Sequence, residues 1–196
     1  MPQGAFKAAL MGTAGVSTGD VVLLSDQDAS DSATLEVTSG ITSTYSHYIF
    51  KFYNIHPETD ATTFGFQVNA AGGSGYNETI TSSSFRAYKY EGGNDDALGY
   101  STAGDQAQGT AYQPLANEVG NDNDQSCAGT LTLWNPSSTT YVKHFTAEVH
   151  EYYGTDYAIR NLTAGYINTT TAIDEISFKF SSGDIQTGTI KMWGVK

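Results

Sequence analysis

Hydrophobic and polar residues alternate along most of this chain, and a period of two predicts β-strands. The segment "TFGFQV" at 63–68 is a clear case, because Phe64, Phe66 and Val68 fall on one face of an extended strand. In the segment 141–152, Phe145, Ala147 and Val149 form one face in the same way. Short β-branched runs at 21–24 and 34–37, and further strand-like segments at 84–90, 131–134, 165–168, 176–180 and 190–195, predict additional strands.

The segment "HYIFKFYNI" at 47–55 differs from the other predicted strands because both of its faces are apolar. One face would carry Ile49, Tyr53 and Ile55, and the other Tyr48, Phe50 and Phe52. Apolar residues on both faces are typical of a central strand that is covered on both sides. We therefore expect this segment in the middle of the fold.

Nine or ten such strands, separated by turns of Gly, Ser, Asn and Asp, predict an all-β protein. The expected architecture is a jelly-roll-like antiparallel β-sandwich of about 8–10 strands with an extended N-terminal arm. The length of 196 residues fits a single domain. In this domain, 1–44 would form an interface-forming arm with the first strands, and 45–196 the sandwich core. The one helix candidate, 5–11, is short.

Two connections between the predicted strands are long, at about 90–129 and 152–165. Loops of this length are uncommon in a compact domain unless they have a function. We expect the first connection to lie across the sheet or to contact a neighbouring subunit.

The chain is strongly acidic, with 21 Asp and Glu residues, 9 Lys and Arg residues and a net charge of −12. A field of this sign repels phosphate backbones and anionic membranes, so neither nucleic acid nor a membrane is an expected partner. The N-terminus lacks the apolar stretch of a signal peptide. The single cysteine, Cys127, cannot form an intrachain disulfide. Folding in a reducing cytosol is the simplest interpretation.

Two groups of side chains are weak candidates for a metal site. His144, Glu148 and His150 share one face of the strand 141–152, and residues two apart on a strand can bridge a metal. The His-x-His motif of cupin metalloenzymes is absent, so an ordinary polar strand face is the favoured interpretation. Asp122 and Asp124 alternate as in a calcium loop, but an EF-hand would need Gly and Glu where Cys127 and Leu133 stand, which favours a plain turn.

Tyrosines are frequent, and several fall in predicted loops. Loop tyrosines supply flat, amphipathic contact area of the kind that protein- and sugar-binding surfaces use, although they also pack at the rims of cores. The candidates for such a surface are Tyr76, Tyr100, Tyr112, Tyr153 and Tyr157.

Several stretches of the chain resemble a group of virion proteins of tailed phages, of the marine and cyanobacterial type. The most specific are "NPSSTTYVKHF" and "FSSGDIQTGTIKMWGV", with support from "FYNIHPETDATTFGFQV" and "ITSSSFRAYKY". The resemblance runs from about residue 45 to the C-terminus and carries no catalytic motif. It implies a jelly-roll-like component of the particle, either a capsid decoration or knob protein or part of a tail appendage.

Three hypotheses about function follow. The first is a non-enzymatic virion protein, assembled in the host cytoplasm as a homotrimer that contacts the major capsid protein or tail proteins. The second is a carbohydrate- or receptor-binding module, a host adhesin that binds host glycans. The third is a cupin-like metalloenzyme that uses His144, Glu148 and His150. The first requires no catalytic residue and no cofactor, and leaves a structural cation at the acidic turn open.

Overall fold

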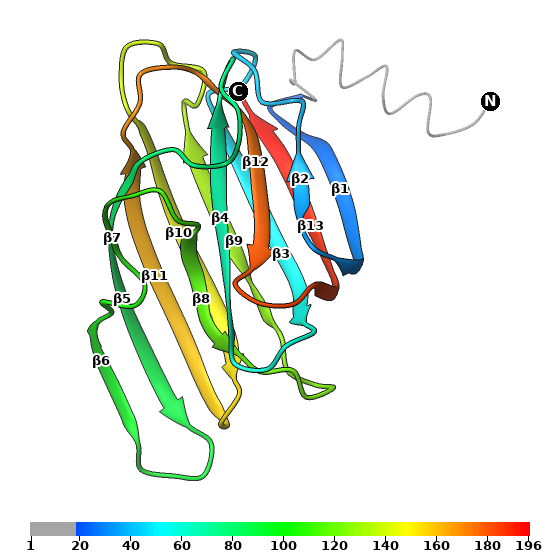
Figure 1. The fold of residues 1–196 in the computed structure, drawn as a ribbon, viewed down its shortest axis with the longest axis vertical. Coiled ribbons are helices and arrows are strands. Elements are labelled where there is room, and N and C mark those ends of the chain that lie inside the picture. Colours follow the sequence, from blue (N-terminus) through cyan, green and yellow to red (C-terminus); the bar gives the residue numbers. More distant parts are fainter. Residues whose placement is uncertain (1–18) are drawn as a thin grey trace, which may run out of the picture.

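The computed structural model describes residues 19–196 of the chain as thirteen antiparallel strands (Figure 1). Within that range there is no helix, and so none long and apolar enough to span a membrane. The helix candidate at 5–11 and the first part of the expected arm lie outside the described residues. The strands are β1 (Val21–Ser32), β2 (Leu35–Val37), β3 (His47–Pro57), β4 (Thr62–Ala70), β5 (Ile80–Tyr90), β6 (Asp96–Tyr100), β7 (Gln106–Gly109), β8 (Gln113–Val119), β9 (Cys127–Trp134), β10 (Lys143–Tyr153), β11 (Tyr157–Ile167), β12 (Ile173–Phe180) and β13 (Ile185–Val195).

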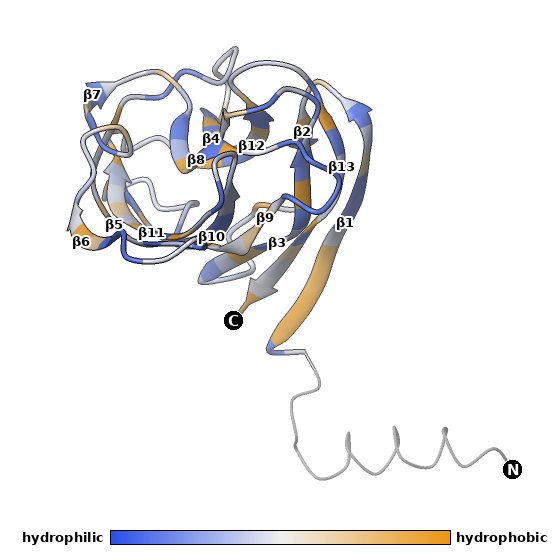
Figure 2. Cartoon of the chain, turned by 90° about the horizontal axis from the view of Figure 1, so that it is seen from below, coloured by the Kyte–Doolittle hydropathy of each residue, from blue (hydrophilic) through white to orange (hydrophobic). Residues whose placement is uncertain are grey.

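The strands form two layers, which confirms the predicted all-β sandwich. A wide sheet has the order β1-β13-β3-β9-β10-β11-β5, and β6 and β7 both pair with its last strand. A narrow sheet has the order β8-β4-β12-β2 and joins the wide one where Tyr153 of β10 pairs with Val119 of β8. Figure 2 shows β4, β8 and β12 facing β5, β11, β10, β9 and β3. At the other side β1 contacts β2, so the two layers nearly close into a barrel.

Phenylalanine rings from both layers meet in the middle of the sandwich. Phe178 of β12 lies with its ring centroid 5.6 Å from that of Phe50 and 5.4 Å from that of Phe52, both on β3. Phe52 also contacts Phe64 of β4 edge to face at 5.3 Å. All four side chains are at most 2% exposed. The inward orientation predicted for Phe64, Phe66 and Val68 is confirmed, since each is fully buried.

The opposite face of the wide sheet, here called the outer face, is not covered by any of residues 19–196. On β3, Tyr48, Phe50 and Phe52 point into the core, whereas Tyr53 on the outer face is 41% exposed. Near the end of β3, Asn54 takes a positive φ of 49° and the register with β9 shifts. The strand lies inside the wide sheet, as predicted, but residues 19–196 cover only its inner face.

Both long connections contain strands that the alternation did not indicate, so the structure has more strands than expected. The first includes β6, β7 and β8, and all five residues of β6 are exposed, so none of its side chains packs into the core. The second is largely β11, whose inward positions include the polar residues Asn161 and Thr163. Alternation of apolar and polar residues therefore fails where the inward side chains are polar.

Buried polar side chains anchor loops to the sandwich. The Gln67 amide donates to the carbonyl oxygens of Glu78, Thr110 and Ala111 at 2.9–3.2 Å. The buried Lys143 ammonium donates to the carbonyl oxygens of Tyr141 and Thr169 at 2.8 and 3.0 Å. These bonds satisfy carbonyls that would otherwise be costly to bury.

The aromatic cluster yields a prediction about stability. Phe178→Ala removes the ring that contacts both layers, and we expect a loss of about 3–5 kcal/mol in the free energy of unfolding. Urea denaturation followed by circular dichroism measures this loss. The control Tyr141→Ala, at a side chain that is 70% exposed, should change the same quantity by less than about 0.5 kcal/mol. A loss near that of the control would show that the ring cluster does not hold the layers together.

Candidate functional site

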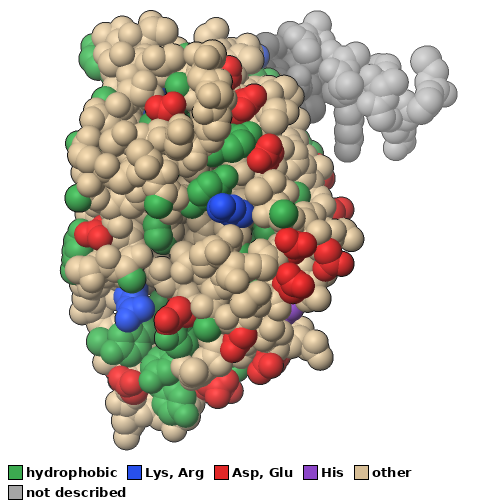
Figure 3. Space-filling view, viewed as in Figure 1, with side chains coloured by type: hydrophobic (Ala, Val, Ile, Leu, Met, Phe, Trp, Pro, Cys, Tyr) green, Lys and Arg blue, Asp and Glu red, His purple; other side chains and the backbone are tan. Residues whose placement is uncertain are grey.

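Four tyrosines meet at one end of the wide sheet, and we call them the tyrosine cluster. The ring of Tyr157 lies 5.7 Å from that of Tyr88, 4.9 Å from that of Tyr90 and 5.8 Å from that of Tyr153. The tight turn between β10 and β11 places Tyr153 opposite Tyr157, and the pairing of β11 with β5 adds Tyr90. Figure 3 shows hydrophobic side chains gathered at this end of the molecule, with acidic side chains around them.

A small pocket of about 240 Å³ lies beside the cluster on the inner side of the wide sheet. The Arg86 guanidinium carbon is 5.7 Å from the centre of the Tyr88 ring, a cation–π contact. The Tyr157 hydroxyl donates to Asp95 Oδ2 at 2.8 Å. A hydrogen bond to Glu118 and burial raise the pKa of Tyr153 to about 12. Its hydroxyl is therefore a protonated donor at neutral pH.

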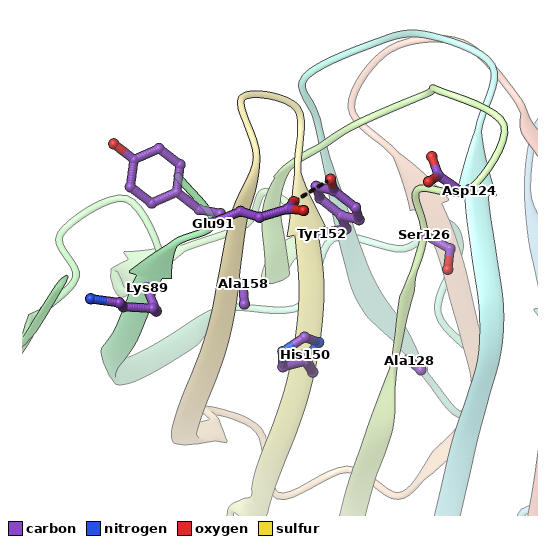
Figure 4. A pocket seen from close by; sticks show the side chains of 9 residues that line it. Lys89, Glu91, Asp124, Ser126, Ala128, His150, Tyr152 and Ala158 are labelled. Atoms are coloured by element: carbon purple, nitrogen blue, oxygen red, sulfur yellow. Dashed lines mark hydrogen bonds between the residues drawn. The ribbon is translucent and has the colours of Figure 1, made fainter. Parts of the chain in front are cut away.

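A larger hollow of about 470 Å³ lies at the same end on the outer face, and we call it the Tyr152 groove (Figure 4). It forms because small residues flank larger ones: Ala128 pairs with His150, and Ala158 pairs with Tyr152. Figure 4 shows Lys89 on one side of this floor and Asp124 and Ser126 on the other. The lining residues are Lys89, Glu91, Asp124, Ser126, Ala128, His150, Tyr152, Tyr157 and Ala158.

Hydrogen bonds fix the side chain of Tyr152, which lines the groove. The Tyr152 hydroxyl donates to Glu91 Oε2 at 2.9 Å and lies 3.3 Å from Asp156 Oδ1. The bond to Glu91 is the main cause of a pKa of Tyr152 above its ordinary value, so the hydroxyl stays protonated. Lys89 is held in turn by an exposed ion pair with Asp96 at 3.1 Å.

A second, more polar hollow of about 490 Å³ adjoins the groove. It shares Asp124 and Ser126 with the Tyr152 groove and continues toward His56 and Thr187. His56 Nδ1 lies 2.6 Å from the carbonyl oxygen of Gln125, which ties the loop between the hollows to β3. The two hollows therefore meet at the turn that carries Asp124.

A buried carboxyl group lies on the inner face of β10, close to the tyrosine cluster. Glu151 is fully buried between Cys127 and Ile159 on the neighbouring strands. Burial raises the pKa of Glu151 to about 8, although Asn161, the Asn117 backbone and Arg86 act to lower it. Neither carboxyl oxygen makes a hydrogen bond of normal geometry. Glu151 is therefore mostly protonated at neutral pH.

The cysteine next to this carboxyl group is also buried. Burial, and to a smaller extent the neighbouring Glu151, raise the pKa of the Cys127 thiol well above its ordinary value. Because the thiolate is the reactive form, this environment disfavours nucleophilic chemistry at Cys127.

The metal candidates from the sequence lie apart from one another or are already paired. His144, Glu148 and His150 share the exposed face of β10 as predicted, but Glu148 forms an ion pair with Arg160 at 2.7 Å. His144 instead contacts the ring of Tyr166. Across residues 19–196 no three His, Cys, Asp or Glu side chains are grouped so that they could hold a metal ion.

The acidic stretch around Asp122 is a turn. The Gln125 amide donates to the Asp122 carbonyl at 2.8 Å, and the Asp122 amide donates to Gln125 Oε1 at 3.1 Å. Both Asp122 and Asp124 are exposed. This geometry matches the turn that the sequence favoured at this position.

The five tyrosines singled out in the sequence do not form one surface. Tyr153 and Tyr157 belong to the tyrosine cluster, but the other three lie elsewhere. Tyr100 is exposed on β6 and donates to Asp105 at 2.6 Å. The Tyr112 hydroxyl donates to Ser177 Oγ at 2.9 Å. Tyr76 lies near Glu36 and Glu175, and burial together with these two carboxylates raises its pKa.

Sequence reasoning missed Tyr152, Tyr88 and Tyr90 as site residues because all three lie in predicted strands. One signal was present. The stretch "YYGTDY" at 152–157 carries Gly and Asp between tyrosines, which is typical of a tight hairpin turn. Such a turn would have placed Tyr153 opposite Tyr157.

Comparison with known proteins adds no family. No protein-family model matches this chain, and no curated protein matches it in sequence. The crystal structure of A. japonicus CB05 is similar over 97% of this chain at 12% identity and a TM-score of 0.26. That of the wild-type fructosyltransferase from A. japonicus is similar over 97% at 13% identity and a TM-score of 0.27. This chain spans 28% of the length of each. TM-scores this low carry no argument about fold or activity.

The buried carboxyl group predicts a pH dependence. The pKa of Glu151 is about 8 in the folded protein, above its ordinary value of 4.5, so folding retains a proton that the unfolded chain releases between these two values. Glu151 should therefore lower the free energy of unfolding by about 1.4 kcal/mol per pH unit in this window. Above it the effect levels off.

The variant Glu151→Gln keeps the shape and removes the titration. We expect its unfolding free energy, measured by urea denaturation at closely spaced pH values, to rise relative to wild type between the two pKa values. Two curves that run parallel across this window would contradict the assignment.

Proposed function

We propose that this protein is a non-enzymatic structural subunit of a phage particle, of the capsid-decoration, knob or tail-appendage type. The observation that supports it most directly is the position of its tryptophans. The chain has two, and Trp134 and Trp193 both lie on the outer face of the wide sheet rather than in the core. Trp134 is 44% exposed and stacks on His47 with ring centroids 4.8 Å apart.

These tryptophans belong to a continuous apolar area, which we call the tryptophan patch. Strand pairing sets its members side by side: Trp193 lies between Ile49 and Leu23, and Val195 pairs with Val21. Val21 and Leu23 are 59% and 48% exposed. Figure 2 shows the start of β1 as hydrophobic where it runs along the edge of the sheet. The patch consists of Val21, Leu23, Ile49, Trp134, Trp193 and Val195.

A second exposed apolar group lies at the opposite edge of the same face. Phe85 of β5 pairs with Tyr100 of β6, and the adjacent Leu98 shares their face. These side chains are 46%, 58% and 75% exposed, respectively. A sheet face with apolar groups at both edges resembles a surface that becomes buried in an assembly.

The chemistry of the tryptophan patch favours contact with protein. Tryptophan is enriched in the centres of protein interfaces, where it contributes a large share of the binding energy. Self-association through this patch would supply the cover that the apolar outer positions of β3 predict. From the resemblance of 45–196 to virion proteins of tailed phages we infer a homotrimer that contacts the major capsid protein or tail proteins in the virion.

The oligomeric state tests this proposal. Mass photometry and light scattering of the full chain should give a particle of three times the subunit mass of 20.9 kDa. The double variant Trp134→Ala/Trp193→Ala should dissociate at concentrations at least about tenfold higher than wild type. Tyr112→Ala removes an aromatic ring from the outside of the narrow sheet and should leave the oligomer intact. A wild type that stays monomeric at every concentration would overturn the proposed assembly.

A further inference from the structure

The Tyr152 groove runs across the strands, from Lys89 on β5 to Ala128 on β9. Its floor crosses β11, β10 and β9, and the polar hollow beyond Asp124 and Ser126 extends the same surface. Each hollow has a volume of several hundred Å³, which is the size range of sites for small molecules. This shape fits an extended ligand of several linked units better than a single compact one.

The groove presents a fixed aromatic surface. The Tyr152 ring lies on β10, and its hydroxyl is held by Glu91 and Asp156, so little side-chain freedom remains to be lost on binding. Ala158 beside Tyr152, and Ala128 beside the adjacent His150, leave space for a ligand to reach the ring. A rigid ring with an apolar face and polar surroundings suits a ligand whose own faces are apolar and whose edges are polar.

The groove also holds polar side chains whose hydrogen-bonding capacity the fold does not use. The side chains of Asp124, Ser126 and His150 all line it. Within residues 19–196 none of the three makes a hydrogen bond or an ion pair through its side chain. A carboxylate accepts hydrogen bonds, whereas a hydroxyl and an imidazole can each donate and accept them. Their natural complement is a ligand with many hydroxyl groups.

The charge around the groove decides between classes of such ligands. Glu91 and Asp124 line it and Asp156 adjoins it, whereas Lys89 is already paired with Asp96. The whole chain carries a net charge of −12. Phosphorylated, sulfated or sialylated ligands would be repelled. An extended peptide would be expected along a free strand edge, whereas this groove crosses the strands.

From these features we propose that the Tyr152 groove binds a neutral oligosaccharide. One sugar ring stacks on Tyr152, and the hydroxyls of neighbouring units bond to Asp124, Ser126 and His150. The groove and the tryptophan patch occupy opposite ends of the outer face. Trp134 and His144 line the same hollow, and the eight residue steps from His144 to Tyr152 span about 26 Å at ~3.3 Å per residue. The groove thus stays open when the patch is covered, and an assembled particle could display it.

The test titrates the full chain with neutral tetrasaccharides built from glucose, galactose, mannose or N-acetylglucosamine, and with a sialylated and a sulfated one. Isothermal calorimetry and saturation-transfer NMR follow binding. At least one neutral probe should bind saturably, and Tyr152→Ala should weaken it by about tenfold or more. Tyr152→Phe keeps the ring and should retain most of the affinity. Tyr100→Ala, an exposed tyrosine outside the groove, serves as the matched control.

A second variant separates loss of sugar binding from loss of the fold. Asp124→Asn lies on an exposed turn and removes only a charge, and it should weaken the same probe severalfold while leaving the melting temperature unchanged. The proposal is overturned if no neutral probe binds wild type, if Tyr152→Ala binds as well as wild type, or if only the anionic probes bind. The Trp134→Ala/Trp193→Ala variant should keep its affinity for the sugar, so failure of the assembly and failure of the sugar site give different results.

Discussion

The packing of phenylalanine rings between the two sheets is the interaction on which the rest of the structure depends. Phe178 contacts Phe50 and Phe52 across the sandwich, and Phe64 completes the cluster. This contact joins a wide sheet to a narrow one, and it occupies only one face of the wide sheet. The same packing that folds the chain therefore leaves the outer face open. The tryptophan patch and the Tyr152 groove both lie on that face, so the proposed assembly and the proposed sugar site share one structural origin.

Alternation along the chain predicted the strands whose inward side chains are apolar, as at 63–68, because burial there depends on hydrophobicity alone. It found only the end of β11, at 165–168, because the inward Asn161 and Thr163 are polar, and it missed β6, where every residue is exposed. The apolar residues on both faces of 47–55 predict a strand that is covered on both sides, and residues 19–196 cover only one of them. The pattern predicts that a face becomes buried, and it does not specify whether the same chain or another molecule buries it.

The candidate site was less predictable than the fold. The shared face of His144, Glu148 and His150 followed from a period of two within one strand. The tyrosine cluster and the Tyr152 groove depend on which strands become neighbours and in what register, as when Tyr157 comes to pair with Tyr90. Registers of this kind are set by tertiary packing and turn geometry, which a single sequence does not reveal. The hollow itself depends on two alanines on separate strands that no local pattern connects.

The claim that the outer face is the contact surface can be tested by tryptophan fluorescence, because both tryptophans lie on that face and neither lies in the core. Acrylamide quenching is measured on the assembled protein and again after dilution to single subunits. We predict ready quenching and red-shifted emission in the single subunit, and protection with a blue shift in the assembly. Equal quenching in both states, or tryptophans already shielded in the single subunit, would contradict the account.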